Sequence, residues 1–175
     1  MPGQDDLIGR VIVEHARAGR ASYLIGKSDG GAFSISEVRE KKLSVEEFPG
    51  FNSVCVSFSK LKLIIEQQIQ SWYGALSNIK GVYLITDRET GKLYVGSATG
   101  DCGLWQRWSS YVTSGHGGNK ELIALLKNKP IDYCSRFQYS ILEIADSHAS
   151  DGYIGKREIY WKDVLMSRVH GYNSN

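Results

Sequence analysis

Two stretches with strand-like character flank a short polar segment in the middle of the chain. Val82–Thr86 is rich in β-branched and aromatic side chains, and Leu93–Val95 continues the same character. The segment between them, 87–92, contains Asp, Thr and Gly, which are typical turn residues. This pattern predicts a β-hairpin whose two strands are joined by a polar turn.

Helical spacing of apolar residues dominates the sequence after the hairpin. A helix is predicted over Leu104–Tyr111, where aromatic side chains recur at helical intervals, and a second begins at the N-cap residue Asn119. Phe137–Ile144 is predicted to be a third strand and Tyr153–Met166 a last helix. The order strand, strand, helix, helix, strand, helix predicts an α+β fold: a small, mostly antiparallel three-stranded sheet flanked by helices.

The first 80 residues carry weaker and more mixed signals, and turn formers at 77–81 suggest a boundary. We therefore expect residues 1–80 to form a mixed α/β N-terminal extension and residues 81–175 to form a separate core. The elements expected in the extension are a helix from Asp5 or Asp6 to about Ala18, a hairpin of Ala21–Ile25 with Ala32–Ile35, a turn or helix at Ser36 and Glu37, a strand over Val54–Phe58 and a helix from Ser59 to Ile69.

Composition excludes some classes of protein. Apolar residues make up 42% of the chain and charged residues 23%, which is ordinary globular usage. No run approaches the ~20 apolar residues of a membrane span, and no secretory signal pattern opens the chain, so we expect a cytoplasmic protein without membrane contact. Three widely spaced cysteines favour neither a disulfide framework nor a zinc site. The net charge of +2 neither indicates nor excludes nucleic-acid binding.

The candidate chemistry lies in the hairpin and in the elements after it. The two strands carry the triplets Gly81–Tyr83 and Tyr94–Gly96, which are followed by Arg107, Glu158 and, near the C-terminus, Asn173 in a Gly-x-Asn sequence. Each feature alone is common, but their conjunction in this order resembles the signature of the GIY-YIG nuclease superfamily, over the whole of residues 81–175. The resemblance implies a metal-dependent endonuclease that hydrolyses phosphodiester bonds in double-stranded DNA.

Glu158 is the residue that the resemblance assigns to a divalent cation, Mg²⁺ or Mn²⁺. One carboxylate on a helix can hold a hard cation whose other ligands are water and phosphate oxygen. The alternative is a helix glutamate that pairs with Lys162, one turn later. Arg107 suits a scissile phosphate because its guanidinium stays charged and binds oxygen atoms as a fork. The alternative is a solvated helix arginine.

The resemblance makes Tyr83 the group that takes a proton from the attacking water, with Tyr94 bonding the phosphate or that water. A phenol with a pKa near ~10 is only about one part in a thousand phenolate at neutral pH. Lowering that pKa by ~3 units requires ~4 kcal/mol of phenolate stabilisation. Arg107 and the metal are plausible sources of that stabilisation. Two alternatives stay open: Tyr83 only relays or orients the water, or both tyrosines are core aromatics.

Two further residues complete the catalytic candidates. Tyr111 lies four residues after Arg107 and therefore on the same helix face. The resemblance places a Tyr or His at that offset in the active sites of restriction-type members. Asn173 either supports the metal side of the site or closes the fold by bonding backbone groups.

Candidate DNA contacts lie around the hairpin turn and in a glycine-bearing loop. Lys92 is close to the turn and supplies charge, and Lys120 follows the loop 114–119. Backbone amides at the start of the helix after this loop suit a DNA phosphate, with Asn119 as the cap. His116 is a candidate contact in the same loop, although a lone loop histidine is more often merely polar.

The compact organisation favours a type II-like restriction enzyme. The alternatives are a structure-selective repair or recombination nuclease and a non-cleaving DNA-binding protein on the same scaffold. A homing enzyme is less favoured because no long linker or separate DNA-binding domain follows the core. A palindromic target favours a homodimer. Residues 1–80 are expected to supply target selectivity, with basic candidates at Arg39, Lys41, Lys42, Lys60 and Lys62.

Overall fold

The computed structural model describes residues 11–14, 34–38 and 46–174, which fall into two compact units, Met1–Ser44 and Val45–Asn175. In the first unit, strand β1 (Val11–Glu14) pairs antiparallel with β2 (Ser34–Val38). The helix predicted through this segment is therefore wrong over Val11–Glu14, because a run of β-branched residues favours a strand over a helix. The turn or helix predicted at Ser36 and Glu37 is also wrong, because both lie in β2.

Only part of the hairpin predicted for the same part of the chain lies within the described residues. Ala21–Ile25 lies outside the described residues, as do Arg39, Lys41 and Lys42. Of the second predicted strand, Ala32–Ile35, the last two residues begin β2, whose partner is β1.

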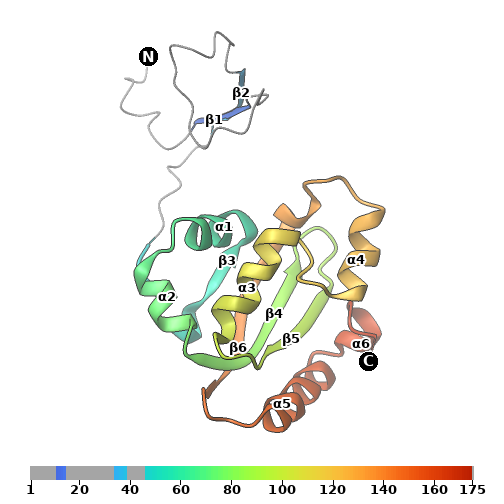
Figure 1. Cartoon of the computed structure of the whole chain (residues 1–175). Helices are drawn as coiled ribbons and strands as arrows, with labels where there is room; N and C mark the ends of the chain where they lie inside the picture. Colours follow the sequence, from blue (N-terminus) through green and yellow to red (C-terminus); the bar gives the residue numbers. More distant parts are fainter. Residues whose placement is uncertain (1–10, 15–33, 39–45, 175) are drawn as a thin grey trace. The chain divides into compact units, whose positions relative to one another are not determined.

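The second unit contains the remaining elements and is shown in Figure 1. Its helices and strands are η2 (Phe51–Ser53), β3 (Cys55–Ser57), α1 (Phe58–Glu66), α2 (Gln70–Leu76), β4 (Ile79–Asp87), β5 (Leu93–Ala98), α3 (Gly103–Ser114), α4 (Lys120–Lys127), η3 (Tyr133–Arg136), β6 (Phe137–Asp146), α5 (Asp151–Val164) and α6 (Ser167–His170). No helix in the described parts of the chain is long and apolar enough to cross a membrane.

The sheet of this unit is fully antiparallel, which confirms the predicted α+β class. It has four strands in the order β3-β6-β4-β5, rather than the three expected. The additional strand, β3, pairs with β6 through partners such as Val56 and Tyr139, which lie far apart in the sequence. Trp72, from the same N-terminal part of the chain, is 1% exposed in the core. The boundary expected at residue 81 therefore lies inside a single packed unit.

Alternation along the central hairpin sends side chains to two separate cores. Tyr83 of β4 and Tyr94 of β5 face the larger core, which α1 and α3 cover. Val82 and Val95 face the other side of the sheet, where they pack with Ile154 of α5. Figure 1 shows α3 and α5 beside the β4–β5 hairpin. The hairpin therefore has side chains in both layers of the fold, and its second strand, β5, is an edge strand of the sheet.

A glycine in β5 gives Tyr83 its position. The side chain of Tyr83 crosses from β4 over Gly96, its partner in the sheet register. A Cβ atom at residue 96 would collide with the hydroxyl and ring of Tyr83. The glycine of the second triplet is thus required by packing, because it lets the phenol of the first triplet reach the edge strand.

A buried carboxylate, Asp87, ties the C-terminal tail to the end of the hairpin. Asp87 is 1% exposed and accepts hydrogen bonds from the hydroxyls of Tyr172 at 2.6 Å, Thr90 at 2.8 Å and Tyr133 at 2.9 Å. The side chain of Asn173 then bonds Val95, accepting from its N–H at 2.9 Å and donating to its carbonyl at 2.8 Å. The tail is therefore fixed against β5.

Asp87→Asn is expected to lower the free energy of unfolding by on the order of 3 kcal/mol, because buried hydroxyl donors lose a charged acceptor. Burial raises the pKa of Asp87, but the hydrogen bonds from Tyr172, Thr90 and Tyr133 outweigh it, so the pKa is lowered. This contribution is therefore present above about pH 4, the unfolded pKa, and is lost as pH falls through the folded pKa.

Urea unfolding at pH 7 and at pH 3 measures both effects of Asp87→Asn. The exposed Asp132 supplies the matched control, and Asp132→Asn should leave the unfolding free energy within about 0.5 kcal/mol. An Asp87→Asn protein as stable as the wild type at pH 7 would show that this network does not hold the tail.

Candidate active site

Arg107 joins two tyrosines from opposite sides of the larger core. Its Nε donates to the hydroxyl of Tyr83 at 2.9 Å, and its Nη2 donates to the hydroxyl of Tyr111 at 3.2 Å. The two hydroxyls are themselves 2.8 Å apart and share a hydrogen bond. The third bond of the guanidinium runs from Nη1 to the carbonyl oxygen of Gly117 at 2.8 Å. The structure thus brings together three of the predicted catalytic residues.

Burial keeps both phenols of this cluster neutral. The pKa of Tyr83 is raised above 10, because burial outweighs the opposing charge of Arg107 and the bonds from Tyr111 and Arg107. Burial also raises the pKa of Tyr111. The guanidinium of Arg107 keeps its charge, since its interactions with the tyrosines raise its pKa more than burial lowers it. The lowered pKa that a phenolate base requires is therefore absent from the protein without DNA.

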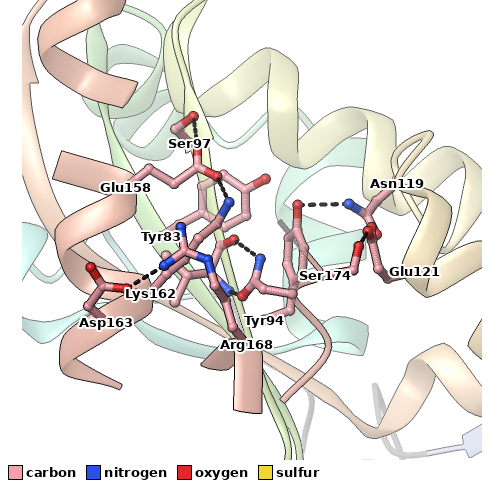
Figure 2. Close-up of polar contacts among 12 residues, drawn as sticks. Tyr83, Tyr94, Ser97, Asn119, Glu121, Glu158, Lys162, Asp163, Arg168 and Ser174 are labelled. Atoms are coloured by element: carbon pink, nitrogen blue, oxygen red, sulfur yellow. Dashed lines mark hydrogen bonds and ion pairs between the residues drawn. The ribbon is translucent and has the colours of Figure 1, made fainter. Parts of the chain in front are cut away.

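Tyr94 is linked to the loop before α4. Its hydroxyl accepts a hydrogen bond from Nδ2 of Asn119 at 2.9 Å, as Figure 2 shows. Asn119 is also the N-cap of α4, as predicted, and its Oδ1 accepts from the N–H of Leu122 at 2.9 Å. Burial raises the pKa of Tyr94 as well. The side chain of Asn119 thus positions Tyr94 and caps the helix, two internal roles for a residue expected to contact DNA.

Glu158 reaches the edge strand from α5, on the other layer of the sheet. One of its carboxylate oxygens accepts a hydrogen bond from the hydroxyl of Ser97, and the other lies 2.7 Å from Nζ of Lys162 (Figure 2). Its side chain is 20% exposed, whereas that of Lys162 is 6% exposed. The pair with Lys162 that the sequence offered as an alternative is therefore present, and the Glu158 side chain in it is still partly exposed.

The surroundings of Glu158 fit a divalent cation that has one carboxylate as its protein ligand. Within the described residues, no group of three or more His, Cys, Asp or Glu side chains is placed to hold a metal ion. Each carboxylate oxygen has two lone pairs, and one of them on each oxygen is used by Ser97 or Lys162. A Mg²⁺ ion that keeps several waters and takes phosphate oxygens needs only one or two protein carboxylates.

A groove of about 340 Å³ is lined by the end of β5, the loop after it and α3. Its lining includes Ser97, the partner of Glu158, and Arg107, the partner of Tyr83. Gln106 and Ser110 of α3 and Thr99 of the loop before it add further polar side chains to the lining. Sequence reasoning missed Ser97. Its position directly after Gly96 could have indicated it, because alternation along β5 places Ser97 on the face of the sheet that α5 covers.

The remaining predicted residues lie at different places. Asn173 bonds the backbone of Val95, so its side chain closes the fold. Lys92 lies 5.6 Å from the ring centre of Tyr172, at the far end of the hairpin. His116 accepts a hydrogen bond at Nδ1 from the N–H of Gly118 at 3.0 Å, and Lys120 is exposed in the first turn of α4.

Comparison with known proteins adds the following. No family model and no curated protein matches the chain. One matching solved structure is the catalytic domain of intron endonuclease I-TevI in a mutant form, at 27% identity over 55% of this chain and 94% of that one, with a TM-score of 0.42. A second is the catalytic domain of homing endonuclease I-TevI, at 29% identity over 54% and 96%, with a TM-score of 0.41.

The class that these observations define is an α+β core with a tyrosine–arginine cluster and one carboxylate at the edge of its sheet. Both matching structures are catalytic domains of the endonuclease I-TevI. The order of the motif residues in this chain resembles the signature of the GIY-YIG nuclease superfamily, and the structure gathers Tyr83, Arg107 and Glu158 around Gly96 and Ser97 of β5.

Proposed function

We propose that this chain is a metal-dependent DNA endonuclease. The observation that supports the proposal most strongly is that one groove is lined both by Arg107 and by Ser97, the residue whose hydroxyl bonds the Glu158 carboxylate. Phosphodiester hydrolysis requires stabilisation of negative charge on the phosphate, an oriented water and help for the leaving oxygen. A fixed guanidinium that lines the groove, and a carboxylate bonded to Ser97 of the same lining, can meet the electrostatic part of that requirement.

Arg107 is the residue proposed to bind the scissile phosphate. A guanidinium has five N–H donors, and three of them are used by Tyr83, Tyr111 and Gly117. Two N–H groups are therefore left to donate to phosphate oxygens from a side chain whose orientation is already fixed. Such preorganised donors stabilise charge that develops in a transition state without further reorganisation.

Tyr83 is proposed to hold Arg107 and to relay a proton. No part of its side chain is exposed, and its pKa is raised, so the neutral phenol is the form present at neutral pH. When Tyr111 donates to Tyr83, the proton of Tyr83 is left available for a further acceptor. In a balanced relay, the phenol would give its own proton to a phosphate oxygen and take one from the attacking water in the same step, so that it stays neutral.

Glu158 is the residue proposed to hold the cation, Mg²⁺ or Mn²⁺. A bound divalent cation supplies Lewis-acid stabilisation of phosphate charge. The hydroxyl of Ser97 fixes the orientation of the carboxylate, in the way that ligating carboxylates are commonly held by hydrogen bonds.

Arg107→Ala is expected to lower the rate of DNA cleavage by roughly 10²-fold or more, because one preorganised charged donor is lost. Arg107→Lys should rescue only part of this loss, since a lysine has no fork to bond both tyrosine hydroxyls and a phosphate together. Single-turnover cleavage of a labelled duplex measures the rate. Full activity in Arg107→Lys would reduce Arg107 to a general positive charge.

A type II-like restriction enzyme is the proposed biological role, and a repair or recombination nuclease is the alternative. Digestion of a defined genome in Mg²⁺, followed by sequencing of the ends, tests the nuclease proposal and separates the roles. Discrete, repeated termini support restriction, and scattered or junction-centred termini support the alternative. An intact genome would contradict the nuclease proposal and favour a non-cleaving DNA-binding protein. A palindromic cut site would favour a homodimer.

Target selectivity is proposed to come mainly from residues before 81. Joint neutralisation of Arg39, Lys41 and Lys42 by glutamine is expected to weaken DNA affinity and to reduce the dependence of affinity on salt, because each phosphate contact releases counterions. Fluorescence anisotropy with a duplex at several salt concentrations measures both. Unchanged affinity and an unchanged salt slope would remove this patch from the interface.

A further inference from the structure

Lys162 is a buried cation beside the proposed metal ligand. It lies one helical turn after Glu158 on α5, is 5% exposed and places Nζ 2.7 Å from a carboxylate oxygen of Glu158 (Figure 2). The other carboxylate oxygen accepts from Ser97, which carries no charge. The charge of the carboxylate is thus already balanced by a fixed ammonium group in the protein without metal.

We propose that Lys162 weakens the binding of a divalent cation by Glu158 in the DNA-free protein. This inference rests on the proposed cation site. A cation bound to Glu158 must sit within several ångströms of the ammonium of Lys162, and the two positive charges repel each other. The ammonium of Lys162 therefore offsets part of the −1 charge that Glu158 offers a cation.

The phosphate of a DNA substrate adds the negative charge that a cation at Glu158 needs. A phosphodiester brings one negative charge into the groove between Arg107 and Ser97, next to the carboxylate that Lys162 neutralises. The cation then gains a second anionic ligand. The charge arrangement consequently favours assembly of the cation site when DNA is present, and Lys162 is the residue that sets this preference.

Burial of Lys162 gives this effect its strength. Water and salt screen the repulsion between an exposed lysine and a cation. The side chain of Lys162 is only 6% exposed, so its repulsion of a cation is screened less. A purely structural ion pair would also explain a buried Lys162, but it predicts a different result: its loss would lower stability and leave the affinity for metal unchanged.

Titration of the DNA-free protein with Mn²⁺, followed by electron paramagnetic resonance of the unbound ion, tests the proposal directly. We expect the wild type to bind Mn²⁺ only at millimolar concentrations, and Lys162→Met to bind it roughly tenfold more tightly or better. Lys162→Arg keeps the charge and should bind as weakly as the wild type. Lys156→Met removes an exposed charge from the same helix and serves as the matched control.

The double variant Glu158→Gln with Lys162→Met should lose the gain, which ties the effect to the Glu158 carboxylate. Micromolar Mn²⁺ affinity in the wild type would overturn the proposal without any variant, so a Lys162→Met protein that fails to fold does not prevent the test. Equal affinity in the wild type and a folded Lys162→Met protein would also overturn it. Because the titration contains no DNA, failure here is distinct from failure of the chain to cleave DNA.

Discussion

Glu158→Gln is expected to abolish DNA cleavage, with a residual rate at least roughly 10³-fold below that of the wild type. The amide has nearly the shape of the carboxylate and can still accept from Ser97, but it carries no charge to hold a cation. Affinity for DNA should be nearly unchanged, because Glu158 offers no positive charge to phosphate. Single-turnover cleavage and anisotropy binding measure the two properties in one preparation.

The ion pair with Lys162 complicates this substitution in a predictable way. Glu158→Gln removes the charged partner of a buried lysine, which is expected to lower the free energy of unfolding by roughly 2 kcal/mol. Combining it with Lys162→Met removes both charges and should recover much of that stability, while cleavage stays absent. Cleavage at the wild-type rate in Mg²⁺ by folded Glu158→Gln protein would show that Glu158 is not the metal ligand.

Tyr83→Phe is expected to slow cleavage by roughly 10²- to 10⁴-fold, the range for groups that transfer protons. The substitution keeps the ring over Gly96 and removes one hydroxyl, which bonds Arg107 and Tyr111. Loss of such a bond lowers stability by only about 1 kcal/mol. The loss of activity should therefore be far larger than any loss of folded protein explains. Tyr94→Phe, which loses the bond from Asn119, should be harmful but less so.

Tyr139 supplies a matched control for Tyr83→Phe. Its ring packs against that of Tyr111 in the same core, and within the described part of the chain its buried hydroxyl has no hydrogen-bond partner. Removal of a buried hydroxyl without a partner should leave stability unchanged or increased. Tyr139→Phe should therefore cleave DNA at close to the wild-type rate.

The pH dependence of cleavage gives a second test of Tyr83. Burial raises the pKa of Tyr83, so a neutral relay adds no rise of the cleavage rate with pH from its own titration, whereas a phenolate base would make the rate rise with pH. If Tyr83 is the base, the rising alkaline limb should flatten in Tyr83→Phe, which lacks the titrating hydroxyl. Near-normal cleavage with an unchanged pH profile would leave Tyr83 as a packing residue and overturn its proposed role.

Local signals in the sequence were sufficient for the elements that carry the site. The alternation around the polar turn predicted β4 and β5, and helical spacing with an Asn119 cap predicted α3 and α4, because turn and cap chemistry act over a few residues. The contribution of β3 to the sheet was not predictable in this way. Its pairing with β6 is set by tertiary packing between distant segments, as in Val56 opposite Tyr139.

The same limit applies to the electrostatics of the site. The sequence suggested that Arg107 lowers the pKa of Tyr83, and the charge does act in that direction, but complete burial of the phenol reverses the outcome. Spacing alone paired Lys162 with Glu158, yet only the packing of α5 on the sheet shows that this lysine is buried. Both effects depend on how much water the fold excludes.

Conversion of supercoiled plasmid to nicked and linear forms by the purified chain tests the central claim most directly. The account predicts that the wild type converts the plasmid in Mg²⁺ or Mn²⁺, that a chelator stops the reaction, and that Glu158→Gln is inactive beside it at equal DNA binding. A plasmid that stays supercoiled with folded, DNA-bound wild-type protein across both metals, or equal conversion by Glu158→Gln, would contradict it.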